Sequence, residues 1–185
     1  MTTTDVAMHM SDGIVNAPTS LIFGVISVLF VGLAAVRARA DLDDRTAPMA
    51  GLVTTFVFAV QMINFPILPG ASGHLLGGAL VAILVGPWVG TLCITIVLVV
   101  QALLFADGGL TALGTNVFNM AIIGVVVGWA VARAMRGLAR RSRGGLLATA
   151  FVAAFVNTVV ASLGFVLEYA IGGAAGATTG TVFVL

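Results

Sequence analysis

The stretch LLGGALVAILVGPWVGTLCITIVLVVQALLF, residues 75–105, decides the fold of this chain. It is apolar and carries no charged residue, which is typical of a segment inside a lipid bilayer. One crossing takes about 20 residues, so the stretch is too long for one crossing and short for two. Gly86, Pro87 and Trp88 stand near its middle. Because proline suits the first turn of a helix and tryptophan suits a membrane interface, we predict two helices that are broken at Gly86 and Pro87.

The composition of the whole chain supports a membrane protein. Of 185 residues, 60% are hydrophobic and 8% are charged, whereas soluble domains carry about 25% charged residues. Further apolar runs cover residues 18–36, 49–65, 112–135 and 146–171. We therefore predict an all-α polytopic transmembrane helical bundle in the cytoplasmic membrane. A single transmembrane domain covers residues 1–185, with an extracytoplasmic tail over residues 1–15 and the bundle over residues 16–185.

The arginines set the number of crossings and their direction. All eight basic residues are arginines, grouped in residues 37–45 and 133–143. Cytoplasmic loops carry the excess of arginine, so an even number of crossings must separate the two groups. Two helices within residues 75–105 satisfy this condition, whereas one would place five arginines outside. The result is about six spans with the N-terminus outside, and it puts His9 and His74 on the same outer side.

These two histidines are the only ones in the chain, and each lies at the end of an apolar run. We expect Ser72 to cap a helix that begins at Gly73 or His74, where the helix dipole keeps the imidazole neutral and able to bind metal. If Met8 were the first residue, its α-amine, the His9 backbone nitrogen and the His9 imidazole would chelate one ion. His74 would complete a plane of four nitrogens, which suits Ni(II), Cu(II) or Co(II). The alternatives are a His9 without a role in an exposed tail and a His74 that only forms hydrogen bonds at the interface.

Other polar residues receive structural interpretations. We expect Asp12, with Gly13, to fold the tail back toward the bundle, and Asp107 to shape an outer loop. Asn116 and Asn119 are three residues apart and share a helix face, where hydrogen bonds between helices are the simplest role. The chain lacks a P-loop, a His-Glu-x-x-His motif and a Gly-x-Ser-x-Gly elbow, so nothing in the sequence indicates an enzyme.

Several ordered motifs resemble one family. Met8-His9-Met10-Ser11-Asp12-Gly13 is similar to the start of the cobalt and nickel permeases of energy-coupling factor (ECF) transporters, the CbiM/NikM type. The resemblance extends from about Met8 to the end of the chain. It continues through residues 58–66, 72–80, 86–88, 101–114 and 116–120.

The resemblance implies a substrate-capturing membrane subunit of an ABC-type importer that takes up Co²⁺ or Ni²⁺, cobalt being used for cobalamin biosynthesis. It implies metal ligands at Met8, His9 and His74, and we add Asp12, Ser72 and Asn119 as candidates for the surrounding shell. The metal is the transported substrate, and no prosthetic group is expected. The implied partners are a transmembrane coupling protein, separate ATP-hydrolysing subunits, a small accessory membrane subunit and the lipid bilayer, but no nucleic acid.

The chain departs from the family at both ends. Seven residues precede Met8, and we expect translation to start at Met8 instead of Met1. A last helix of the family is missing, so we expect a fragment that lacks a seventh span. Two other functions stay open: a stand-alone metal channel or secondary carrier, and a structural membrane subunit that binds no ligand. The residues do not distinguish cobalt from nickel, nor do they define the oligomeric state.

Overall fold

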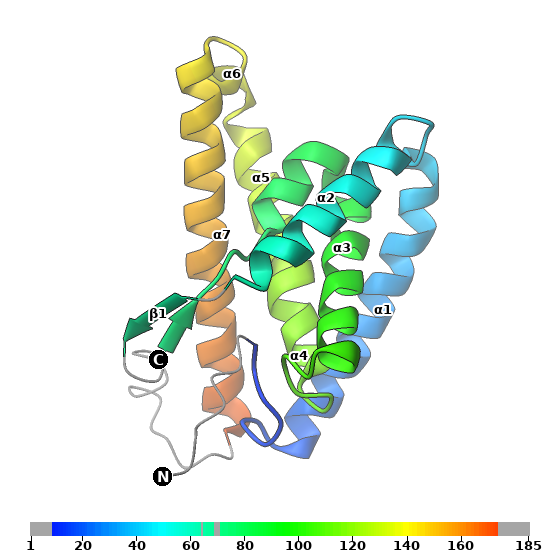
Figure 1. Cartoon of the computed structure of the whole chain (residues 1–185), viewed down its shortest axis with the longest axis vertical. Coiled ribbons are helices and arrows are strands. Elements are labelled where there is room, and N and C mark those ends of the chain that lie inside the picture. The colour runs from blue at the N-terminus through cyan, green and yellow to red at the C-terminus, as the bar shows by residue number, and fades with distance from the viewer. Residues whose placement is uncertain (1–8, 64, 69–70, 174–185) are drawn as a thin grey trace.

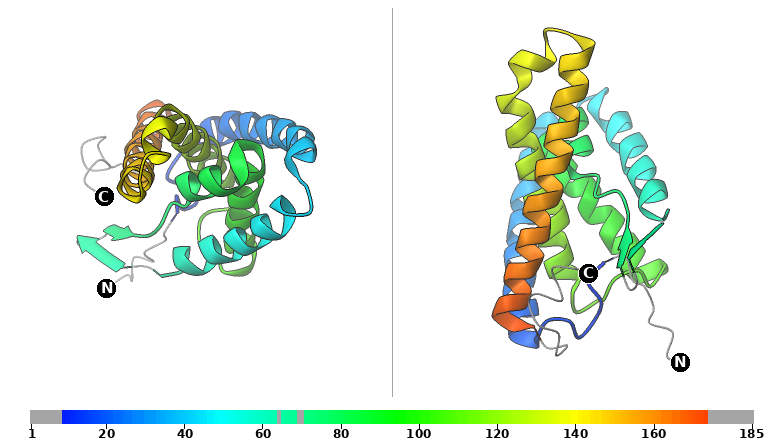
Figure 2. Two further views of the ribbon diagram at one scale, coloured as in Figure 1. Left: turned by 90° about the horizontal axis from the view of Figure 1, so that it is seen from above. Right: turned by 90° about the vertical axis from the view of Figure 1, so that its left-hand side faces the viewer.

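The computed structural model describes residues 9–63, 65–68 and 71–173, and it is a bundle of long helices (Figure 1). α3 and α5 lie in the middle, between α1 and α2 on one side and α7 on the other (Figures 1 and 2). In chain order the helices are α1 (Ala17–Asp41), α2 (Thr46–Gln61), α3 (Gly78–Leu104), α4 (Leu113–Asn116), the π-helix η1 (Val117–Ile123), α5 (Gly124–Ala134), α6 (Arg136–Ala139) and α7 (Arg143–Gly172). A small antiparallel hairpin, β1 (Phe65–Leu68) and β2 (Ala71–Gly73), joins α2 to α3. The all-α membrane bundle is confirmed, and the hairpin is an addition to it.

Local signals explain where the long helices begin. The Asn16 side chain accepts a hydrogen bond from the Thr19 amide at 3.0 Å, and a proline stands in the first turn of α1. The Ser142 hydroxyl accepts one from the Gly145 amide at 3.0 Å at the start of α7. These side chains satisfy amides that have no partner within the helix, so each fixes a helix start.

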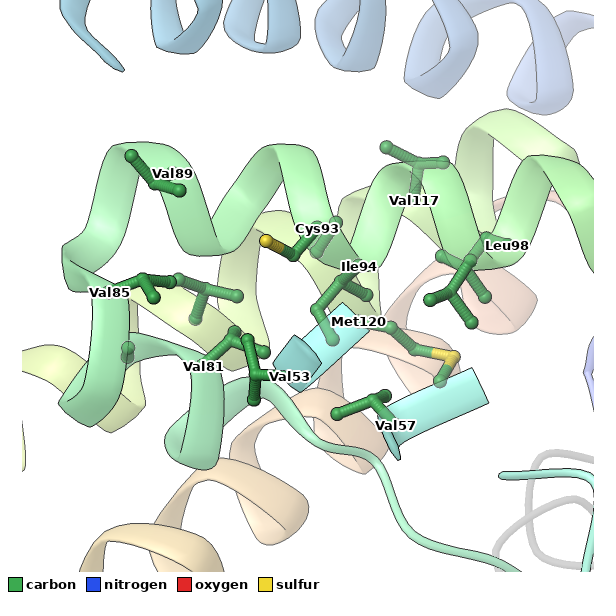
Figure 3. Close-up of a cluster of buried hydrophobic side chains, with 14 of the residues drawn as sticks. Val53, Val57, Val81, Val85, Val89, Cys93, Ile94, Leu98, Val117 and Met120 are labelled. Atoms are coloured by element: carbon green, nitrogen blue, oxygen red, sulfur yellow. The ribbon is translucent and has the colours of Figure 1, made fainter. Parts of the chain in front are cut away.

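The predicted break within residues 75–105 is confirmed. Gly86 has a non-helical backbone with φ of 82° and ψ of 172°, a region that favours glycine. A Cβ built on Gly90 would lie 3.3 Å from the backbone carbon of Val81, although nine residues of straight helix would span about 13 Å. Figure 3 shows the chain changing direction between Val85 and Val89. α3 therefore consists of two limbs, residues 78–85 and 87–104, that fold back on each other.

The beginning of α3 differs from the prediction. Residues 71–73 form β2, residues 74–77 have no regular structure, and the helix starts at Gly78, so a helix from Gly73 or His74 capped by Ser72 is wrong. Gly77 turns the chain into the helix with φ of +81°, and a Cβ there would lie 2.7 Å from the Val57 side chain. The chain must pass this close to α2 before it can begin a helix, and only glycine permits the turn.

Because of this late start the first limb is short. A helix over residues 78–85 is about 12 Å long, against a hydrocarbon thickness of about 30 Å. The irregular residues 74–77 therefore belong to this pass through the bundle. Within a membrane, the polar groups of such irregular backbone need hydrogen-bond partners from the protein. The side-chain amide of Gln61 donates one such hydrogen bond to the Leu76 carbonyl at 2.9 Å.

The bundle is held by small residues and an apolar core. A Cβ on Gly78 would lie 2.7 Å from the backbone carbon of Gly124, and one on Gly128 would lie 2.6 Å from the Cα of Ala79. Such close approach of backbones is a common way to pack membrane helices. The core between α2, α3 and η1 is shown in Figure 3 and includes Val53, Val57, Val81, Val85, Val89, Cys93, Ile94, Leu98, Val117 and Met120. Large apolar side chains such as Leu29 and Leu147 are exposed on α1 and α7, where they suit contact with lipid.

The two ends of the bundle differ in charge. At the arginine end, Arg37 lies 5.6 Å from the ring of Trp88 and Arg133 lies 5.3 Å from the ring of Trp129, so the break in α3 is on this side. At the other end, which we call the outer mouth, the chain from residue 9 to residue 16 meets the loop 105–112 and the end of α7 (Figure 1). Among the described residues four helices are long and apolar enough to cross a membrane, and α2 is shorter. With α3 taken as two limbs, six segments connect the ends, in agreement with about six spans.

Candidate functional site

The N-terminal segment, residues 9–16, is a fixed part of the outer mouth. Asn116 binds the backbone of Met10 from both sides: its Oδ1 accepts from the Met10 amide at 3.0 Å, and its Nδ2 donates to the Met10 carbonyl at 3.1 Å. The amide of Gly109 donates to the same carbonyl at 2.9 Å. Asn116 is itself buried at the start of the helix that continues into η1. The backbone next to His9 is therefore held against the middle of the bundle.

Asp12 joins the segment to the loop 105–112, in agreement with the expectation that it folds the tail back toward the bundle. Its Oδ1 accepts hydrogen bonds from both the hydroxyl and the amide of Thr111. The hydroxyl contact, followed by the backbone amides of the loop, lowers the pKa of Asp12 below its usual value, although desolvation opposes the shift. A Cβ on Gly109 would collide with Asp12, so the loop can approach the segment only with glycine at this position. The tail folds back onto the bundle over the described residues 9–15.

His9 and His74 come together at this mouth, although 65 positions separate them. Their ring centroids are 5.0 Å apart and their planes meet at 60°. His9 is 6% exposed, and its Nδ1 lies 3.4 Å from Oδ2 of Asp107. Neither ring nitrogen of His9 has a hydrogen-bond partner among the described residues. A buried imidazole that makes no hydrogen bond is costly unless something binds it, because each polar atom has lost its water.

The surroundings of His74 define which of its nitrogens carries the lone pair. Its Nδ1 lies 3.1 Å from the Leu75 carbonyl oxygen, which can only accept a hydrogen. A neutral ring that makes this bond carries its hydrogen on Nδ1 and its lone pair on Nε2. Gln61 holds the Leu76 carbonyl one residue further along. A hydrogen bond that orients the ring through its other nitrogen is the usual support of a metal-binding histidine.

The remaining predicted site residues fall in different places. Met8 lies outside the described residues, and the side chain of Ser72 is not among those described. Asn119 donates to Glu168, one helical turn deeper than Asn116. In the part of the chain that the structure describes, no three His, Cys, Asp or Glu residues gather in a set that could hold a metal ion. The two imidazoles would need further nitrogen donors, such as an amine or a backbone nitrogen, to complete a four-coordinate site.

Two supporting residues were missed by the sequence reasoning. Asn116 was interpreted as an interhelical contact, but it binds Met10, which is 106 positions away. Gln61 lies inside an apolar run and received no role from the sequence, and it is fully buried against the chain that follows His74. The available signal was their position inside apolar runs, because a polar side chain within a membrane segment seldom lacks a partner.

Comparisons with known proteins identify relatives of this chain in sequence and in fold. Residues 9–185 match the family described as the cobalt uptake substrate-specific transmembrane region, CbiM. A protein of Archaeoglobus fulgidus that is named for fused nickel transport (NikMN) is 40% identical over 156 residues, which are 84% of this chain and 50% of that protein. The cobalt transport protein CbiM of Lachnoclostridium phytofermentans is 32% identical over 88% of this chain and 66% of its own length. The crystal structure of a truncated transition metal transporter superposes with a TM-score of 0.78 at 32% identity, covering 87% of this chain and 73% of the other. The chain thus spans half the length of its Archaeoglobus relative.

Proposed function

This chain belongs to the CbiM family of cobalt-uptake transmembrane proteins, and from that premise we propose that it captures Co²⁺ or Ni²⁺ at the outer mouth for delivery across the cytoplasmic membrane. In this proposal it is the substrate-specific component of an ECF-type importer. A transmembrane coupling component and separate ATPases supply the energy. The observation that supports the capture step most strongly is the buried His9 ring, whose nitrogens lack hydrogen-bond partners among the described residues, beside His74.

We propose a ligand set of the Met8 amine, the His9 backbone nitrogen, the His9 imidazole and the His74 imidazole. Asn116 and Asp12 would act by holding residues 9–12 in register, so that the nitrogen plane is rigid before the ion arrives. A rigid site matters for selectivity, because most nitrogen sites bind Cu²⁺ more tightly than Co²⁺ or Ni²⁺. Selection against Cu²⁺ therefore depends on a fixed ligand geometry and not on affinity alone.

The test of capture is the metal content of the purified full chain after loading with Ni²⁺ or Co²⁺ and desalting. Wild type should retain one ion per chain, and His74→Ala and His9→Ala should lose it. Thr158→Val is the matched control, since Thr158 is exposed on α7 and bonds only to its own helix. Equal metal in wild type and His74→Ala would contradict capture and would favour a structural subunit.

The amine ligand has its own test. A chain that starts at Met8 should bind Ni²⁺ more tightly than one that starts at Met1, since only the first offers an α-amine beside His9. Equal affinities would remove Met8 from the ligand set and leave the two histidines.

Delivery is tested by uptake into sealed vesicles. We expect accumulation of metal only when the coupling component and the ATPases are present and ATP is supplied. Uptake by this chain alone would contradict the importer and support a stand-alone channel or carrier.

A further inference from the structure

A second polar cluster lies beneath the outer mouth, where η1 packs against α7. Glu168 is 1% exposed and Asn119 is 6% exposed. The amide nitrogen of Asn119 donates to Oε2 of Glu168 at 2.6 Å. The other two oxygens, Oε1 of Glu168 and Oδ1 of Asn119, have no hydrogen-bond partner among the described residues. This pair therefore holds two buried acceptors that no donor in the described part of the chain satisfies.

Asn157 extends the cluster toward the arginine end. It is 1% exposed, and its Oδ1 also lacks a partner among the described residues. Oδ1 of Asn157 lies 3.0 Å, and the backbone oxygen of Asn119 lies 3.4 Å, from the point where a Cβ of Gly124 would be. Asn157 precedes Glu168 by eleven residues on α7, which is about 16 Å along the helix axis, so it belongs to the same helix contact but is too far away to share one ion with Glu168.

The local backbone is adapted to this arrangement. Asn119 lies within the π-helix η1, a rare geometry that occurs frequently at functional sites. On the opposite helix, a Cβ on Gly164 would collide with Oδ1 of Asn119. Only glycine there lets the Asn119 amide reach between Gly164 and Glu168.

A buried carboxyl group is expensive to ionise unless it is paired or binds a cation. A carboxyl group inside a membrane bundle normally pairs with a base or marks an ion pathway. Among the described residues no arginine or histidine lies within 4.0 Å of Glu168. Oε1 of Glu168 and Oδ1 of Asn119, which have no donor among the described residues, can serve as ligands for a cation, because carboxylate and amide oxygens suit hard divalent ions.

We propose that Glu168 and Asn119 form an inner site that holds the divalent cation after it leaves the outer mouth. This inference rests on the proposed transport function, because the occupant is the cargo. Asn119 follows Asn116 by three residues on one rod, so the inner site lies about 5 Å deeper along the helix axis. An ion released by the histidines would meet the Glu168 carboxylate next.

The two sites should prefer different metals, and this difference gives the test. Nitrogen sites bind Mn²⁺ weakly and Ni²⁺ strongly, whereas oxygen sites accept Mn²⁺. Mn²⁺ binding to the full chain in detergent is therefore measured by electron paramagnetic resonance, and Ni²⁺ binding is measured in parallel. We expect Glu168→Gln to weaken Mn²⁺ binding by about 10- to 100-fold, as the loss of metal-site groups usually does, and to leave Ni²⁺ affinity unchanged.

The reciprocal variant separates this site from the outer one. His74→Ala should lose the tight Ni²⁺ binding of the outer mouth, retain only the weaker Ni²⁺ binding of the inner site and keep Mn²⁺ binding, and Thr158→Val should keep all three. Unchanged Ni²⁺ binding in Glu168→Gln also shows that the variant is folded; if it is not, Asn119→Ala is measured in its place and should lose Mn²⁺ in the same way. The inner site is refuted if wild type binds no Mn²⁺ or if the Glu168 and Asn119 variants keep it. Failure of outer capture would instead show as Ni²⁺ binding that is as tight in His74→Ala as in wild type.

Discussion

Asn116→Leu should weaken metal binding without removing any metal ligand. The leucine is close to asparagine in size, but it can neither accept from the Met10 amide nor donate to the Met10 carbonyl. The carbonyl keeps the bond from Gly109, whereas the amide would be left buried without a partner. An unsatisfied buried donor costs about 1–3 kcal/mol. If the lost hydrogen bond destabilises the metal-bound conformation of residues 9–12 by this amount, Ni²⁺ affinity drops by about 5- to 150-fold.

The assay is a competition titration of Ni²⁺ against a coloured chelator, with protein in detergent. Asn157→Leu is the matched control, since Asn157 is also a buried asparagine and lies in the middle of α7, away from both the N-terminal segment and the Glu168–Asn119 pair. Asn116→Leu should lose affinity and Asn157→Leu should keep it. The reasoning fails if Asn116→Leu binds Ni²⁺ as tightly as wild type, or if both variants weaken equally.

Three further changes have definite outcomes. Asp12→Asn should lower Ni²⁺ affinity less than Asn116→Leu does, because Thr111 keeps one acceptor. The hydrogen bonds of Thr111 lower the pKa of Asp12, so the carboxylate stabilises the segment at neutral pH. This contribution should be lost only as the pH falls below about 4 and through the lowered pKa. Resistance of residues 9–16 to protease measures it, and a loss of resistance near pH 6 would contradict it. Gly78→Val should prevent the close packing of α3 on α5 and lower thermal stability by about 1–3 kcal/mol, measured by the melting temperature in detergent; an unchanged melting temperature would count against the packing. Gln61→Leu leaves the Leu76 carbonyl without its bond and should reduce Ni²⁺ affinity by about 5- to 150-fold, whereas an unchanged titration would show that Gln61 does not position the chain after His74.

Much of the fold was predictable because its signals are local. Gly86 and Pro87 interrupt an apolar run, and their effect on the backbone does not depend on distant residues. The arginines act through the charge difference across the membrane, so counting them gave the even number of crossings. The same count put His9 and His74 on one side, where their rings meet.

The parts that were missed depend on distant contacts. Ser72 has the chemistry of a helix cap, but the close passage of Gly77 over Val57 delays the helix until Gly78. Asn116 has no neighbour in sequence that reveals Met10 as its partner. A local motif indicates which kinds of group a residue can bind. Which of the possible partners lies close enough depends on how the whole bundle packs.

Nickel-edge X-ray absorption on the loaded chain tests the central claim most directly, because imidazole rings give a distinct scattering pattern around the metal. Two imidazoles sharing one ion are predicted for wild type, and one for His74→Ala at whatever occupancy remains. A wild-type spectrum with a single imidazole, or with none, would contradict the claim that His9 and His74 bind the same ion.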